Sequence, residues 1–153
     1  MDSESIVGST FVKFGVLFNT DPYGADPSVK SPEDFLVFAT EHFVMNGRVA
    51  KATMTWAEAN IQRLDPESVK TKMKLKSSVV QIYMAGIVTQ ALQSIKDAML
   101  DKKWLCITDI PASKERLLPF GEYGKFSNSI FNRYNISMPA LRAEPKKYLR
   151  KLG

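Results

Sequence analysis

The spacing of apolar residues predicts a mainly helical chain. Apolar side chains recur every three or four residues over much of the sequence, which is the period of a helix with one buried face. Within residues 77–100, one stripe consists of Val80, Met84, Ile87, Ala91, Ile95 and Ala98. Further apolar residues widen this stripe, so we expect a central helix that is buried on most sides. Gly86 in its middle either costs about 1 kcal/mol relative to alanine or permits close packing.

Local capping patterns predict where other helices start and end. The run 31–34 (SPED) supplies an N-cap hydroxyl, a proline in the first turn and two acids at the positive end of the helix dipole. The run 65–67 (DPE) again places a capping residue before a proline. Residues 125–134 carry an apolar helical face that Asn135 closes, and Pro145 begins a last short helix. Helices are therefore expected after 31 and 65, over 125–134, and after 145.

Two segments leave the type of element open. The pair Asn46-Gly47 is both a helix C-cap signal and a strong hairpin turn. We favour a helix after it, because the alanine-rich run 57–59 suits one. In residues 70–76, lysine occupies every second position. On a strand these lysines would share one face, whereas on a helix they would spread over two sides.

Short strands are expected in two places. Residues 11–18 are dominated by aromatic and β-branched side chains, and residues 104–107 form a short apolar run that includes Trp104. The expected fold is therefore a compact, mainly α-helical bundle with a few short strands. The length of 153 residues predicts one domain over 1–153. Within it we expect a flexible acidic N-terminus over 1–10 and a basic C-terminal arm over 142–153.

Composition excludes several classes of protein. With 44% hydrophobic and 24% charged residues, the chain is globular rather than disordered. One cysteine and one histidine allow no internal disulfide and no multi-cysteine zinc site, so no metal or other cofactor is expected. The acidic N-terminus does not resemble a secretory signal, and no apolar run is long enough for a transmembrane segment. We expect an intracellular protein, in cytoplasm or nucleus, that is not secreted.

The charge is distributed unevenly along the chain. The formal net charge is +5, but residues 1–101 carry 10 basic and 12 acidic side chains. Residues 102–153 carry 11 basic and 4 acidic side chains, a net of +7. This asymmetry indicates an anionic partner for the C-terminal third.

Nucleic acid is the partner that this charge favours. Aromatic residues are interleaved with the cations, and aromatic rings stack on unpaired bases, which favours RNA or single-stranded DNA over duplex. The lysine run adds a candidate phosphate-binding stripe. The candidate nucleic-acid-binding residues are Lys70, Lys72, Lys74, Lys76, Lys125, Arg133, Tyr134, Arg142, Lys146, Lys147, Arg150 and Lys151.

Catalysis has little support in the sequence. The only histidine, His42, lies on an apolar helical stripe, and Cys106 lies in an apolar run where a thiol is usually inert. We therefore expect a non-enzymatic structural protein that binds nucleic acid and self-associates, of the viral coat or nucleocapsid kind. The alternative is an adaptor or regulatory module that binds an acidic protein partner through the same charge.

Overall fold

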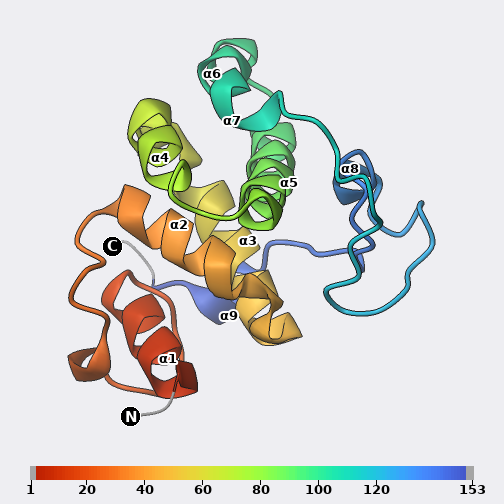
Figure 1. The fold of residues 1–153 in the computed structure, drawn as a ribbon. Helices are drawn as coiled ribbons and strands as arrows, with labels where there is room; N and C mark the ends of the chain where they lie inside the picture. Colours follow the sequence, from red (N-terminus) through yellow and green to blue (C-terminus); the bar gives the residue numbers. More distant parts are fainter. Residues whose placement is uncertain (1–2, 151–153) are drawn as a thin grey trace.

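In a computed structural model that describes residues 3–150, the chain is built from α-helices joined by loops and 3-10 turns (Figure 1). The predicted mainly helical fold is confirmed. Within the described residues there are isolated bridges but no β-strand, so the two predicted strands are wrong. The helices are α1 Ser3–Lys13, α2 Pro32–His42, α3 Gly47–Asn60, α4 Pro66–Met73, α5 Ser78–Ile95, α6 Ala98–Lys103, α7 Leu105–Thr108, α8 Ser129–Asn132 and α9 Pro145–Tyr148.

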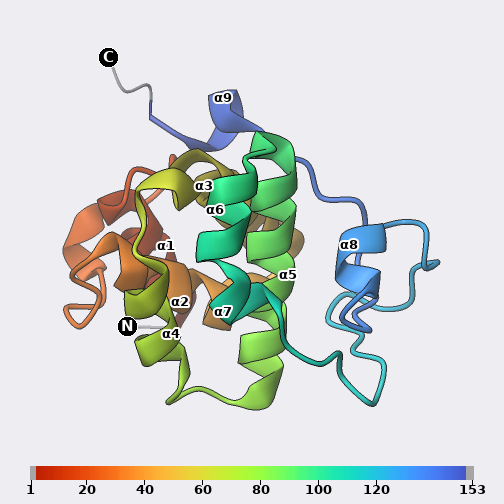
Figure 2. The ribbon, with the colours of Figure 1, turned by 90° about the horizontal axis from the view of Figure 1, so that it is seen from above.

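Helix α5 is the centre of the arrangement, because it packs against α2, α3, α7 and α8. The loops on either side of α8 form a lobe beside α5, set apart from the other helices (Figures 1 and 2). From this lobe the chain returns past α3 to α9. We call residues 139–150, which make this return, the strap.

An aromatic cluster forms the core where α1, α2 and α3 meet. Phe35 is fully buried at its centre. Its ring lies 4.9 Å from the ring of Phe11, 4.7 Å from that of Phe14 and 4.7 Å from that of Trp56. The Trp56 indole N–H donates to the carbonyl of Phe14, so its polar atom is satisfied inside the core. The N-terminal helix is thus bound to the body of the protein through aromatic packing.

The lobe is joined to α5 by the packing of Phe131 against Gly86. Phe131 is fully buried, and a Cβ built on Gly86 would lie 2.6 Å from its ring. No side chain fits in that space without movement of the ring. Gly86 therefore permits close packing, which is one of the two roles considered for it, and here the partner is the ring of Phe131 in α8.

The helix starts predicted after residues 31 and 65 and at Pro145 are confirmed. Ser31 and Asp34 form a reciprocal capping box at the start of α2, and Asp65 caps α4. Helix α9 begins at Pro145. Asn46 ends the 3-10 turn Phe43–Met45, and a helix rather than a hairpin follows it. Its side chain accepts a hydrogen bond from the N–H of Val49 and thereby caps the start of α3.

The strand expected over residues 11–18 is instead the end of α1. Gly15 has a φ of +97°, and the N–H of Val16 donates to the carbonyl of Phe11. The N–H of Gly15 donates to the carbonyl of Val12, which completes a Schellman motif. Aromatic and β-branched residues suggested a strand, but this glycine stop belongs to a helix. Of the segment 1–10, expected to be flexible, residues from Ser3 on are helical and Val7 is buried; residues 1–2 lie outside the described part.

Two predicted helices are shorter than expected, and the second predicted strand is helical. The helix predicted over 77–100 ends at Lys96, which adopts a left-handed conformation, and Asp97 then caps α6. Trp104 and the residues after it form the junction of α6 and α7, so the second predicted strand is a helical turn. Of the helix predicted over 125–134, only Ser129–Asn132 is helical, and Asn135 closes it as expected, with a φ of 62°.

Candidate nucleic-acid interface

The strap is docked on the body of the protein rather than extending as a free arm. The Gln90 side chain donates to the carbonyl of Leu141 over 2.6 Å, and the N–H of Glu144 donates to the Thr55 hydroxyl over 3.0 Å. Tyr148 is 2% exposed, and its carbonyl accepts from the N–H of Leu17. Residues 142–150 of the basic arm expected over 142–153 are therefore docked on the body; residues 151–153 lie outside the described part of the chain.

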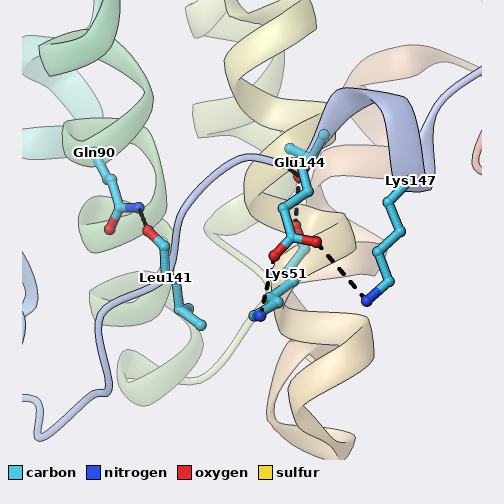
Figure 3. Close-up of polar contacts among 6 residues, drawn as sticks. Lys51, Gln90, Leu141, Glu144 and Lys147 are labelled. Carbon is cyan, nitrogen blue, oxygen red and sulfur yellow. Dashed lines mark hydrogen bonds and ion pairs between the residues drawn. The ribbon is translucent and has the colours of Figure 1, made fainter.

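A groove with three cations lies between the first turn of α3 and the strap. Arg48 and Lys51 project from α3, and Lys147 projects from α9. Glu144 lies between the two lysines, with its carboxylate oxygens 3.1 Å from the Lys51 ammonium and 3.8 Å from the Lys147 ammonium (Figure 3). Three cations and one carboxylate leave two positive charges in excess. We call this the cationic groove; its volume is 750 Å³.

A second groove adjoins the cationic groove along the strap. It lies between α5 and the loop before α8, and the two grooves share Ala140 and Leu141. Six of its thirteen lining residues carry amide or hydroxyl side chains, and the others include one arginine, one glutamate and one aromatic ring that is 85% exposed. We call it the polar groove; its lining includes Glu58, Gln93, Phe126, Ser129 and Arg142.

The lysine run lies on a different face from the strap. Residues 70–76 belong to the last turns of α4 and the turn after it, so the helical alternative for this run is correct. Lys72 forms an ion pair with Asp34 at 2.9 Å, and Lys76 forms one with Glu41 at 2.8 Å. Helices α4 and α9 lie apart in both views of the fold (Figures 1 and 2). Lys70 and Lys74 lie on this same segment, away from the cationic groove.

The pocket beside the lysine run carries an excess of negative charge. It is lined by Asp26, Asp34 and Glu41 as well as by the two paired lysines. Carboxylates repel phosphate, and these acids already neutralise Lys72 and Lys76. Two of the four lysines, Lys72 and Lys76, thus join the α4 segment to α2 and are not free for phosphate. On this helical segment the four lysines do not share one face as they would on a strand.

We expect the Asp34–Lys72 pair to make stability depend on pH. Partial burial raises the pKa of Asp34, but hydrogen bonds from Lys72 and from the N–H groups of Lys30 and Ser31 outweigh it and lower the pKa to about 2. Because this value is below the ordinary 3.8, the stabilisation is present above about pH 4 and is lost as the pH falls towards 2. Asp34→Asn should therefore cost about 1–2 kcal/mol at pH 7.

Urea unfolding of both proteins between pH 7 and pH 3 measures this effect. The difference between wild type and Asp34→Asn should stay constant down to about pH 5 and shrink below pH 4. A difference that does not change over this range would contradict the role given to the Asp34 carboxylate.

Tyr134 was predicted to stack on a base, and the structure contradicts this prediction. Its side chain is 7% exposed. Its hydroxyl lies 2.9 Å from the Thr89 hydroxyl and donates to the carbonyl of Thr108 over 2.7 Å. The ring is buried, and its hydroxyl is hydrogen-bonded to Thr89 of α5 and to Thr108 of α7, so it cannot stack on a base. Tyr134 stabilises the lobe against α5 and α7.

The other predicted residues are distributed over several surfaces. Lys147 lines the cationic groove and Arg142 lines the polar groove. Lys125 lies beside Phe126, with its ammonium 5.2 Å from the ring centre. The exposed Lys146 lies on α9, and the Arg150 guanidinium donates to the carbonyl of Val12. Arg133 lines a separate pocket together with Asp101 and Asp109, and Lys151 lies outside the described residues.

Sequence reasoning missed two cations and misjudged one ring. Arg48 and Lys51 come from the N-terminal part of the chain, where acids outnumber bases, so net charge concealed them. Their i, i+3 spacing on a helix was the available signal, because it places both on one face. Phe126 lies in the segment 125–134, whose apolar face was expected to pack, yet its side chain is 85% exposed.

The remaining side chains considered for catalysis are those of Cys106 and His42. Burial raises the pKa of the Cys106 thiol, and His42 Nδ1 lies 2.8 Å from the carbonyl of Phe38 in its own helix. Within residues 3–150, no group of three or more His, Cys, Asp or Glu side chains is placed to hold a metal ion. None of the helices described is long and apolar enough to cross a membrane.

The fold and these two grooves define the class of protein: a helical protein with a cationic groove beneath a docked C-terminal strap. Comparison with protein families, curated proteins and solved structures gives no match.

Proposed function

We propose that this chain is a non-enzymatic structural protein that binds RNA or single-stranded DNA. The observation that carries the proposal is the cationic groove, in which Arg48, Lys51 and Lys147 converge from two helices far apart in sequence. Convergent cations neutralise phosphates and release counterions, which is the main source of affinity for a nucleic-acid backbone. Self-association and a coat or nucleocapsid role remain predictions that accompany this proposal.

The groove suits an extended anion better than a small one. Its volume of 750 Å³ far exceeds that of one phosphate, and it continues across the strap into the polar groove. The carboxylate of Glu144 already contacts Lys51 and Lys147, so an incoming phosphate competes with it at those ammonium groups. Arg48 has no carboxylate partner within the described residues, although its guanidinium lies 4.9 Å from the ring of Phe18.

The test is a fluorescence-anisotropy titration of a labelled 12-nucleotide RNA at several salt concentrations. We compare wild type with a variant that combines Arg48→Gln, Lys51→Gln and Lys147→Gln. Loss of three contacts to a single strand should reduce the slope of log affinity against log salt by about 2, and the affinity by about 100-fold at 0.1 M salt.

A matched control removes three exposed cations elsewhere. Lys74→Gln, Lys102→Gln and Lys103→Gln change the net charge equally, but they lie on or beside α4 and α6, away from α9 (Figure 1). This control should lose only a small part of the affinity. Equal losses in both variants would show that binding follows net charge and not the groove. No binding by wild type at low salt would overturn the proposal and favour an acidic protein partner.

A further inference from the structure

We propose that the polar groove is a site for an unpaired nucleobase, which stacks on the ring of Phe126. This inference rests on the proposed function and deepens it, because it makes single-stranded nucleic acid the ligand and assigns a different part of that ligand to each groove. Phosphates would bind in the cationic groove, and a base would enter the polar groove across the strap. The chemical class of ligand is therefore a single-stranded nucleic acid with at least one unstacked base.

The exposure of Phe126 is the first support. Its side chain is 85% exposed, although phenylalanine is normally buried in a folded protein. The Lys125 ammonium lies 5.2 Å from the ring centre, so a cation accompanies the ring. Aromatic rings beside cations are the usual elements of single-strand binding, because every base has a face that can stack.

The walls of the polar groove provide groups that suit base edges. Gln93 and Ser129 line it, and neither side chain has a hydrogen bond within residues 3–150. An amide can donate and accept at once, as can a hydroxyl, so both can pair with the edge of a base. Glu58 also lines this groove. Its carboxylate repels phosphate but accepts hydrogen bonds from amino and imino groups of bases.

The two grooves adjoin, so one strand can place its phosphates in the cationic groove and a base in the polar groove. Ala140 and Leu141 line both, so no other part of the chain separates the phosphate site from the base site. Arg142, which belongs to the strap, lines the polar groove and provides a cation there. The strap is held there by the hydrogen bond from Gln90 to Leu141 (Figure 3). The relative placement of the two sites is thus set by the docked strap.

The experiment compares Phe126→Leu with wild type on three probes: a mixed-sequence 12-nucleotide RNA, the same RNA paired with its complement, and polyphosphate. Loss of one stacked base should weaken binding to the single strand about 5- to 150-fold. Affinity for the duplex and for polyphosphate should stay the same, because neither offers a free base. Phe126→Tyr keeps an aromatic ring and should restore wild-type affinity for the single strand.

Tyr23→Leu is the matched control, because Tyr23 is 94% exposed and lies in a 3-10 turn beside α1. It should leave all three affinities unchanged. If Phe126→Leu binds the single strand as wild type does, or loses the same factor on every probe, the base site is wrong while the proposed function stands. If wild type binds none of the three probes, the proposed function itself fails.

Discussion

Ending the chain after Leu141 is expected to lower the free energy of unfolding by at least about 4 kcal/mol. The truncation removes Tyr148, which is 2% exposed, and loss of a large buried aromatic side chain alone costs about 3–5 kcal/mol. It also removes the backbone hydrogen bonds from Leu17 to Tyr148 and from Arg150 to Gly15. Each such bond contributes about 0.5–1.5 kcal/mol. Urea unfolding followed by circular dichroism measures the loss.

A full-length variant separates docking from charge. Arg142→Gln, Lys146→Gln and Lys147→Gln remove three exposed cations and leave Tyr148 and the backbone bonds in place. Surface changes of this kind usually alter stability by less than about 0.5 kcal/mol per site. This variant should therefore fold like wild type and bind RNA more weakly. A truncated chain as stable as wild type would show instead that the strap is a free arm.

Phe35→Ala is expected to cost about 3–5 kcal/mol, the range measured when a buried aromatic residue is truncated. Its ring is fully buried and lies within 5 Å of the rings of Phe11, Phe14 and Trp56. Removing it leaves a cavity among side chains from three helices, and rigid aromatic neighbours cannot close such a cavity fully. Since small proteins are stable by about 5–15 kcal/mol, this loss removes a large part of the free energy of unfolding.

The matched control for this prediction is Phe126→Ala, which makes the same chemical change at a side chain that is 85% exposed. Thermal unfolding of both variants should show a large drop in melting temperature for Phe35→Ala and almost none for Phe126→Ala. A loss below about 1 kcal/mol at Phe35 would contradict the central place given to the aromatic cluster.

The helix starts could be predicted because their causes are local. Ser31 and Asp34 bond to each other's backbone within one turn, and Asp65 and Asn135 act over two or three residues. The strand predicted over 11–18 failed at a point where local information was also present. Gly15 ends α1, but the aromatic and β-branched residues around it indicated a strand more strongly than this single glycine indicated a helix end.

The candidate site was predictable only in part. The excess of cations after residue 101 drew attention to the strap, and Lys147 and Arg142 of the strap line the two grooves. The regular spacing of the lysine run was misleading. Its partners, Asp34 and Glu41, lie about thirty-five positions earlier in the sequence, and only the packing of α4 on α2 brings them together.

By itself, the sequence determined the helical character of this protein, most of its helix starts and the sign of the charge on its C-terminal third. These depend on hydrogen bonds and side-chain spacing within one or two turns. The tertiary structure decided which cations meet, that Tyr134 is buried and that Phe126 is exposed. Those outcomes depend on long-range packing, in which a strap from the end of the chain docks on α3 and brings Lys147 to Lys51.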